Sequence, residues 1–446
     1  MSKSRHRLSR RGFIRSAGLG AAGMSLLPTA RVWGNGAEQF EGPLLVTLQL
    51  DGGADVTQLC DPKTNTIGEP KINHWADTQE IEQVGNLRFA PVAANAELFG
   101  RHGPDMLVIN GVDSQTNSHD TGRLYNWTGG NAEGKPSLAA LHAAYSAPNQ
   151  PLAYSVFGNF SRTSGIISYN RFSNLQVLRS LAQPSIDPWS GNLRREQAEL
   201  DRASTLVSDE VAQLLANPGL SSRKRQSIAR FSEARALRES LSRLAEVIPS
   251  EDDIVNTYEV AVPGSPTLHM NLQQQMQGAL LVFKSGLGAA AEVSLDGFDT
   301  HDNHDLQHEA LYTHLADSLD FFWDYAGQLG LAERILLVIG SDFGRTNFYN
   351  DGNGKDHWPI GSYMIMEKNA AWGNRVVGLT DELHFAMGIN AETLKEDANG
   401  VYMTPSHVHK AIQQYMGFDL FAEDLGLGLN NVESLPLFDP FKATFG

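Results

Sequence analysis

The chain has 446 residues, of which 41% are hydrophobic and 19% charged, so it can bury a sizeable core and is not intrinsically disordered. Its 51 acidic and 35 basic residues give a net charge of -16, which excludes a general nucleic-acid binder because phosphate contacts depend on Lys and Arg. The single cysteine, Cys60, excludes an intramolecular disulfide and a cysteine-based metal cluster. Any metal must therefore be held by His, Asp and Glu.

The first 30 residues contain six basic residues and no acidic one, which leaves 29 basic and 51 acidic residues in the rest of the chain. The run Ser-Arg-Arg-Gly-Phe-Ile-Arg (9–15) precedes a weakly apolar stretch, 16–27, that is too short to span a bilayer. We interpret residues 1–35 as a twin-arginine signal peptide, cleaved between Ala30 and Gly36. The alternative is a basic tail followed by a core helix. No other segment approaches the roughly 20 apolar residues of a transmembrane helix, so we expect a periplasmic or secreted protein, exported already folded.

Apolar runs at 44–50, 106–112 and 334–340, and a weaker one at 289–295, predict buried strands. Between them lie helical patterns, the clearest at 304–328. This alternation predicts an α/β fold with a mostly parallel central sheet and helices on both faces. We expect one domain over 36–446, with a charged helical insertion near 190–250 that is either a solvated covering layer or a coiled-coil partner site. Residues 404–416 predict a helix that closes the same domain.

Acidic residues follow three of the predicted strands, namely Asp51, Asp299 and Asp342. In an open parallel sheet ligands bind beyond the carboxyl ends of the strands, so these three carboxylates are expected to converge at one edge. His301 follows the second acid and His357 follows the third. The five residues are our candidate ligands for a divalent metal. Carboxylate with imidazole suits zinc, manganese or iron, and calcium is a further candidate.

Several neighbouring residues have two interpretations. His304 and His308 form either a polar helix start or, with His301, a helical metal-binding face. Asp55 and Asp356 either support the ligands or lie in simple turns. The loop 350–356 resembles a calcium loop, but Ser362 stands where an EF-hand needs its glutamate.

Six ordered motifs carry a family resemblance. They are the twin-arginine leader, Leu-Asp-Gly-Gly-Ala-Asp (50–55), Ser-His-Asp (118–120), Gly-Phe-Asp-Thr-His (297–301), Ser-Asp-Phe-Gly-Arg-Thr (341–346) and Asp-His-Trp (356–358). Together they resemble the exported family called domain of unknown function 1501, which is similar to the alkaline phosphatase and sulfatase superfamily. The resemblance implies an order of metal and nucleophile positions: Asp51, the loop 117–129, Asp299 with His301, Asp342, and His357.

The loop 117–129 is similar to the sulfatase signature, in which Arg stands four residues and Thr-Gly nine and ten residues after the nucleophile. This comparison puts His119 in the nucleophile position and Arg123 in the arginine position. Sulfatases use Cys or Ser there and phosphatases Ser or Thr, so His119 is a metal ligand, a nitrogen nucleophile or a general acid/base. Ser118 or Thr121 supplies the oxygen if the loop is shifted. Arg123 and Arg345 either bind an oxyanion or form structural ion pairs.

These features predict an exported metal-dependent hydrolase of phosphate or sulfate esters, with His119, Arg123 and Arg345 as catalytic residues. The expected substrate is a small anionic ester or a sulfated or phosphorylated glycan. The alternative is a non-catalytic exported protein that retains the fold and binds a glycan or a partner. A redox protein is disfavoured because the chain has no haem, flavin or cysteine-cluster motif.

Overall fold

The computed structural model describes residues 38–187 and 189–440, which lie in one compact unit, 38–446. The predicted signal peptide, 1–35, lies entirely outside the described residues, and its interpretation stays a prediction. No helix among the described residues combines the length and the apolar character needed to cross a membrane.

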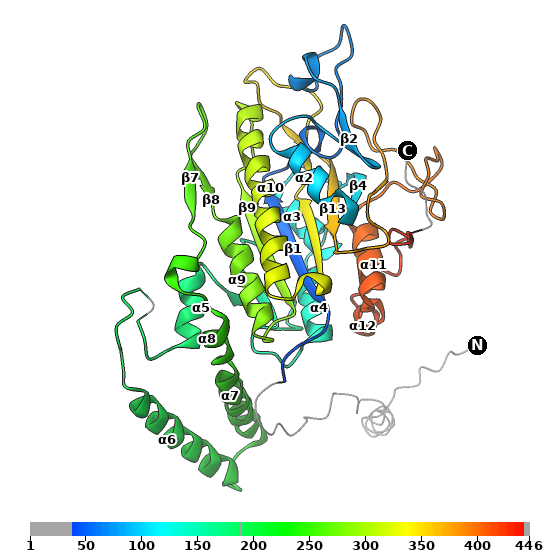
Figure 1. Cartoon of the computed structure of the whole chain (residues 1–446). Helices are drawn as coiled ribbons and strands as arrows, with labels where there is room; N and C mark the ends of the chain where they lie inside the picture. Colours follow the sequence, from blue (N-terminus) through cyan, green and yellow to red (C-terminus); the bar gives the residue numbers. More distant parts are fainter. Residues whose placement is uncertain (1–37, 188, 441–446) are drawn as a thin grey trace, which may run out of the picture. The chain divides into compact units, whose positions relative to one another are not determined.

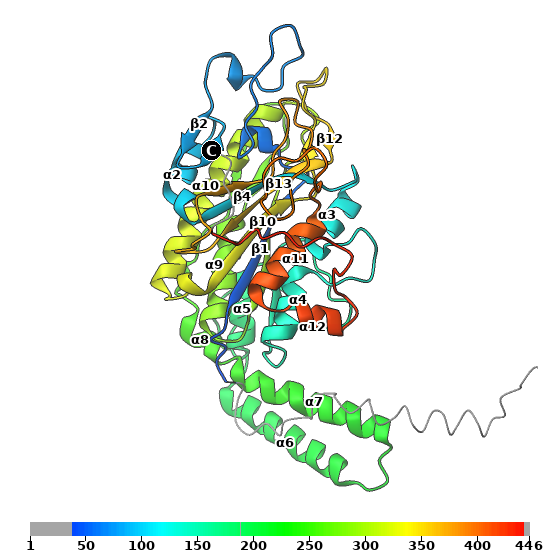
Figure 2. The same cartoon turned by 90° about the vertical axis from the view of Figure 1, so that its right-hand side faces the viewer.

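A central eight-stranded sheet organises the described part of the chain (Figures 1 and 2). In sheet order its strands are β14 (Arg375–Val377), β4 (Met106–Asp113), β13 (Ile360–Met366), β10 (Ile335–Ser341), β1 (Leu44–Asp51), β9 (Ala290–Asp296), β5 (Tyr154–Val156) and β6 (Asn170–Arg171). Neighbouring strands are parallel except where β13 pairs with β10 and β4. The predicted mostly parallel sheet is thus confirmed, and the four predicted strands correspond to β1, β4, β9 and β10.

Alternate side chains of β1 enter two different cores. Leu44, Val46, Leu48 and Leu50 pack in one apolar cluster, and Leu45 packs in another on the opposite face. A strand buried on both faces needs a nearly continuous apolar sequence, which is why β1 could be recognised.

Helices cover both faces of the sheet (Figures 1 and 2). The first cluster includes side chains of α2 (Asn95–His102), α9 (Leu272–Lys284) and α10 (His304–Gln328). The second includes α3 (His119–Thr128), α4 (Leu138–Ser146), α11 (Pro405–Met416) and α12 (Asp419–Asp424). The helices predicted at 304–328 and 404–416 are therefore confirmed.

The predicted helical region near 190–250 contains α6 (Gln197–Ala216), α7 (Ser222–Ser240) and α8 (Arg243–Val247). Helix α8 packs with α5 (Leu175–Ala182) and α9 through a separate apolar cluster. Helices α6 and α7 pack against each other. Most of the described α6 side chains are exposed, as expected for a solvated helical surface.

The remaining strands form three two-stranded ribbons. They are β2 (Glu82–Val84) with β3 (Leu87–Phe89), β7 (Tyr258–Val260) with β8 (Leu268–Met270), and β11 (Gly344–Arg345) with β12 (His357–Trp358). In the last ribbon Arg345 pairs directly with His357. This pairing brings the segment after β10 and the late histidine to the same edge of the main sheet.

Candidate metal centre at the carboxyl edge of the sheet

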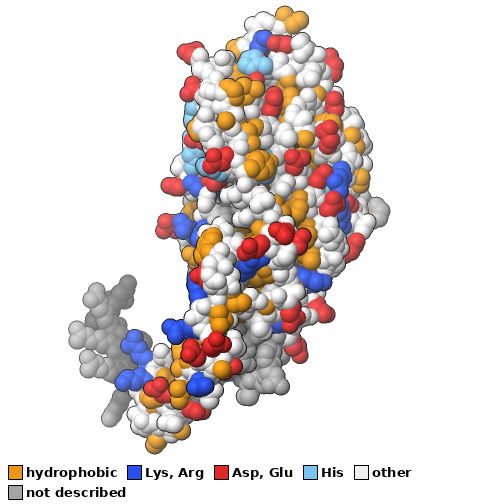
Figure 3. All heavy atoms as spheres, turned by 60° about the vertical axis from the view of Figure 1, so that its left-hand side comes forward, with side chains coloured by type: hydrophobic (Ala, Val, Ile, Leu, Met, Phe, Trp, Pro, Cys, Tyr) orange, Lys and Arg blue, Asp and Glu red, His pale blue; other side chains and the backbone are white. Residues whose placement is uncertain are grey.

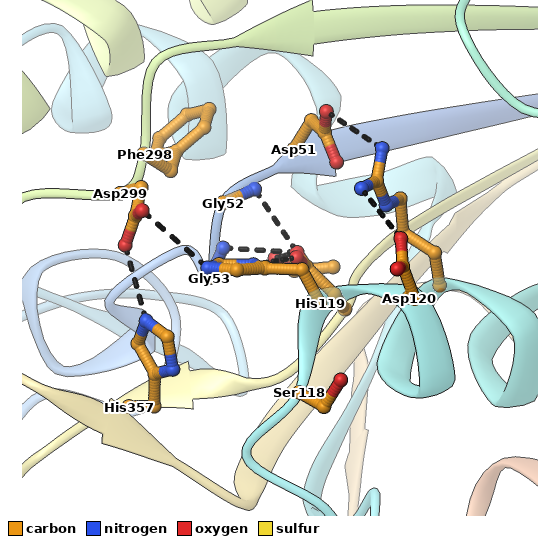
Figure 4. A network of polar contacts seen from close by, with 12 residues as sticks. Asp51, Gly52, Gly53, Ser118, His119, Asp120, Phe298, Asp299 and His357 are labelled. Carbon is orange, nitrogen blue, oxygen red and sulfur yellow. Dashed lines mark hydrogen bonds and ion pairs between the residues drawn. The ribbon is translucent and has the colours of Figure 1, made fainter.

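Three imidazoles and one carboxylate meet beyond the ends of β9 and β10. Nε2 of His301 lies 3.1 Å from Oδ1 of Asp299 and 3.1 Å from Nε2 of His357. Nε2 of His357 lies 3.2 Å from the same Asp299 oxygen, and Nε2 of His119 lies 3.4 Å from Oδ2 of Asp299. Figure 4 shows Asp299 and His357 directed toward each other, with His119 nearby at the start of α3. Potential ligand atoms of His119, Asp299 and His357 all lie within 4.8 Å of one another.

The other ring nitrogen of each histidine is bonded to an oxygen atom. Nδ1 of His357 lies 2.8 Å from the carbonyl oxygen of Asn117, which can only accept a hydrogen bond, so Nδ1 carries the proton. Nδ1 of His301 lies 2.7 Å from Oδ1 of Asp356, and Nδ1 of His119 lies 2.6 Å from Oδ2 of Asp342. In the neutral form of each ring, these contacts make Nε2 the nitrogen with the lone pair, and all three Nε2 atoms face Asp299.

This arrangement fits a metal ion. Lone pairs that face a carboxylate with no proton between them repel one another unless a cation lies among them. Nε2 of His119 is buried and forms no hydrogen bond, and a buried polar atom without a partner is costly. Imidazoles whose second nitrogen donates to a carboxylate or a carbonyl oxygen are the usual form of metal-binding histidine.

Asp342 is fully buried behind His119, and its two oxygen atoms have different partners. Its Oδ1 accepts hydrogen bonds from Gln49 and Ser341 and from the backbone amides of Gly52 and Gly53, at 2.9–3.2 Å. The remaining oxygen bonds to His119 and holds that ring. The hydrogen bond that His119 donates to Asp342 raises the pKa of His119.

The turn after β1 requires glycine for this contact. Gly52 has a φ of +117°, and a Cβ atom at this position would lie 2.4 Å from the backbone nitrogen of Asp299. A side chain would therefore collide with the segment that carries two candidate ligands. The absence of a side chain lets the amide of Gly52 approach Asp342 while Asp299 passes close by.

The buried side chain of Arg345 holds Asp299 in place. Its guanidinium donates to the carbonyl oxygens of Gly52, Gly53 and Lys355, and to Oδ1 of Asp299 at 2.7 Å. Burial by itself raises the pKa of Asp299, but the hydrogen bond and charge of Arg345 outweigh it and lower the pKa to about 2. Asp299 is therefore ionised throughout the neutral range, and Arg345 is buried with four of its donors engaged.

Asp51 lies at the same edge of the sheet but is bonded elsewhere. Its Oδ2 is 3.4 Å from Nη1 of Arg123 (Figure 4). Nη2 of the same guanidinium lies 3.4 Å from the exposed Asp120. Burial and the nearby charge of Asp342 raise the pKa of Asp51 to about 6. The five ligands predicted from the sequence thus form two groups in the structure. Asp299, His301 and His357 meet, whereas Asp342 and Asp51 lie beside them with other partners.

His304 and His308 belong to a buried network beneath these loops. The hydroxyl of Thr300 lies 2.7 Å from Nδ1 of His304 and 3.3 Å from Nδ1 of His308. Nε2 of His304 lies 2.9 Å from Oδ2 of Asp55, and the same oxygen accepts from Lys355 at 2.6 Å. Burial lowers the pKa of His304 and of His308, so both rings are neutral.

Three functional features of the site escaped the sequence interpretation. The Asn117 carbonyl orients His357, Thr300 joins two histidines, and Lys355 pairs with Asp55 across the fold. In the sequence, Thr300 lies between the candidate ligands Asp299 and His301, and Lys355 lies two residues before His357. This proximity to candidate ligands is the sequence feature that could have identified Thr300 and Lys355.

Comparisons with known proteins find solved structures of low sequence identity and one matching family. A glycosaminoglycan-metabolism protein of Bacteroides thetaiotaomicron is 9% identical, with a TM-score of 0.38 over 85% of this chain and 73% of the other. The lipoteichoic acid synthase of Listeria monocytogenes is 8% identical (TM-score 0.33, 85% and 72%), and a sulfatase from Pseudoalteromonas sp. is 11% identical (TM-score 0.33, 77% and 66%). No curated protein matches the chain. The family resemblance is confirmed by the family model, which matches residues 43–419 and so includes all of the motifs except the twin-arginine leader: the chain belongs to the family described as "Protein of unknown function (DUF1501)".

Proposed function

We propose that this protein is an exported metal-dependent hydrolase of phosphate or sulfate esters. The observation that carries the proposal is the convergence of the Nε2 atoms of three imidazoles on the ionised Asp299. A divalent ion held there by His119, Asp299, His301 and His357 would supply Lewis-acid chemistry, polarising an ester oxygen and lowering the pKa of a bound water. The order of the motifs along the sequence, similar to that of phosphatases and sulfatases, supports an ester of phosphate or sulfate as the substrate class.

The chain's own residues take separate parts in this proposal. His119, Asp299, His301 and His357 hold the ion, and Asp342, Asp356 and the Asn117 carbonyl keep the proton on the far nitrogen of each ring. Arg345 keeps Asp299 ionised and in place.

Arg123 and Asp51 provide the polar groups next to the proposed ion. The Arg123 side chain is 26% exposed, so its guanidinium can pair with an oxyanion of the substrate. With a pKa of about 6, Asp51 can accept or donate a proton near neutral pH.

The surroundings favour a substrate with a single anionic group. The carboxylates of Asp51 and Asp120 flank Arg123, Asn159 binds Asp296, and Asp356 is half-exposed beside His301. Asp and Glu side chains are also distributed over the face drawn in Figure 3. A densely charged polyanion would meet repulsion here, so we propose a small anionic ester or a sparsely sulfated or phosphorylated glycan.

The test is a panel of aryl phosphate, bis-aryl phosphodiester and aryl sulfate substrates with metal-loaded protein. We expect turnover of at least one ester that is lost in His301→Ala and falls at least roughly 100-fold in Arg123→Ala. His269→Ala is the matched control, because this histidine is 73% exposed and pairs only with Glu259 at the surface. Turnover that persists unchanged in His301→Ala would assign the activity to a contaminant and refute the proposal.

A non-catalytic binding protein is the second candidate. Four protein ligands and no oxygen nucleophile at position 119 favour it, because structural metal sites are closed by protein side chains. The exposed fractions of Asp299 and His301, 48% and 45%, favour catalysis, because they leave one side of the ion open to substrate. Full metal occupancy with no turnover across the panel would select the binding protein.

A further inference from the structure

The ring nitrogens in this site outnumber the carboxylates available to an ion. Asp342 faces the ring of His119 and uses its second oxygen for four hydrogen bonds. Asp51 is paired with Arg123. Asp356 accepts from His301 and from the amide of Asn350. Among the residues described at this edge, Asp299 is the carboxylate that lies within 3.4 Å of the Nε2 atoms of all three imidazoles, and its Oδ1 also accepts from Arg345 at 2.7 Å.

From this donor set we infer that the centre selects a divalent first-row transition ion of the zinc or iron class over calcium and magnesium, with His119 as its third imidazole ligand. Calcium takes six to eight oxygen ligands and magnesium an octahedron of oxygens, whereas imidazole suits zinc, iron, copper and nickel. Three imidazoles and one carboxylate supply too few oxygens for either hard cation.

The fixed tautomers strengthen this selection. Each imidazole is held with its Nδ1 proton on an oxygen acceptor, so Nε2 is the nitrogen left to bind an ion, and it is already oriented toward Asp299. An ion that prefers oxygen gains little from this arrangement, whereas one that prefers nitrogen meets ligands that are already oriented.

The inference also assigns a role to His119. As a ligand through Nε2, its imidazole has no lone pair left for a covalent bond to substrate, because Nδ1 is protonated and bonded to Asp342. The position at which sulfatases hold a nucleophile would then hold a metal ligand. The hydrolysis proposed above would use water directly and form no covalent adduct with the protein.

Cobalt(II) is the probe for the test, because its visible absorption and its X-ray absorption report the ligands without any need for activity. We expect the full-length protein to bind about one equivalent of cobalt with the intense absorption of a low-coordinate nitrogen-rich site. The X-ray absorption should contain the outer-shell scattering of three imidazoles. A roughly thousandfold excess of calcium or magnesium should leave the spectrum unchanged, and equimolar zinc should abolish it.

Two variants locate the ligands. His119→Ala and His301→Ala should each remove one imidazole from the X-ray spectrum and weaken cobalt binding, and His301 is sufficiently exposed that its removal spares the fold. His269→Ala should bind cobalt as the unaltered protein does. His301→Asp, which exchanges a nitrogen for oxygens, should shift the preference toward calcium.

The inference rests on the proposed metal centre and not on the proposed hydrolysis, and the outcomes separate the two. Cobalt bound by three imidazoles without turnover of any ester would refute the hydrolase and support the inference. Displacement by calcium at comparable concentration, or a spectrum unaltered in His119→Ala, would overturn the inference even if an ester is hydrolysed. No binding of cobalt or zinc would overturn both.

Discussion

Oδ2 of Asp342 lies 2.6 Å from Nδ1 of His119, while Oδ1 of the same carboxylate accepts hydrogen bonds from two backbone amides. The carboxylate thus has one oxygen fixed by donors and one that faces the ring. The protonation of His119 is therefore determined by a residue 223 positions away in the sequence.

Asp342→Asn should reverse the tautomer of His119. The new carbonyl oxygen must face the amides of Gly52 and Gly53, so the new NH₂ group points at Nδ1. Nδ1 would then accept, Nε2 would carry the proton, and the lone pair for the metal would be lost. We expect metal affinity to fall roughly 10- to 100-fold, measured by competition with a chromophoric chelator.

Asp120→Asn is the control for this change. Asp120 has a 97% exposed side chain and contacts Arg123 rather than a histidine. Its metal affinity should match that of the unaltered protein. Equal affinities for Asp342→Asn and Asp120→Asn would show that Asp342 does not set the tautomer.

Asp356→Asn replaces the charged acceptor for Nδ1 of His301 by a neutral one at the protein surface, and so lowers the basicity of the ring. Asp356 is 56% exposed and bonds to Nδ1 of His301 at 2.7 Å. We expect about a tenfold or greater loss of metal affinity with an unaltered free energy of unfolding of the metal-free protein. Calorimetric titration and urea unfolding measure the two quantities. A large loss of stability without loss of affinity would contradict the prediction.

Thr300→Val should destabilise the protein and Thr300→Ser should not. Valine has the same shape but leaves Nδ1 of His304 without its donor and Nδ1 of His308 without its acceptor. Each buried unsatisfied nitrogen costs about 1–3 kcal/mol, and serine restores the hydroxyl. Urea unfolding of the two variants gives the comparison. Equal stabilities of the valine and serine variants would show that the Thr300 hydroxyl does not stabilise the buried network.

The buried Glu292 should make stability depend on pH. Burial raises the pKa of Glu292 from 4.5 to about 8, while Tyr154 donates to its carboxylate and Arg171 is the charged group that opposes the shift. Because the folded state holds the proton more tightly than the unfolded chain, this contribution is complete below pH 4.5. It is lost as pH rises through about 8.

Glu292→Gln tests this contribution, because glutamine is neutral at every pH. Between about pH 5 and pH 8 the unaltered protein should lose stability relative to this variant by roughly 1 kcal/mol per pH unit. Urea unfolding at several pH values gives the slopes. Parallel slopes for the two proteins would show that Glu292 is ionised in the folded state.

Different parts of this structure were predictable to different degrees. β1 and β10 could be read from continuous apolar runs, and Asp299, His301 and His357 from their places after strands. Asp342 also follows a strand, but its sequence position could not tell that its carboxylate faces a glycine turn and a histidine ring. The pairing of Asp55 with Lys355 joins residues 300 positions apart, and no local pattern encodes such a contact.

The ribbon that pairs Arg345 with His357 has a consequence for the lifetime of the fold. The four proposed ligands come from the start of α3, the loop after β9 and this ribbon, so an unfolded chain cannot present them together. A bound ion would act as a reversible cross-link among these segments. At about one hundred times its dissociation constant it would add ~2.7 kcal/mol to the stability. When the metal is scarce, the protein would then become more susceptible to proteolysis, whether or not a substrate is present.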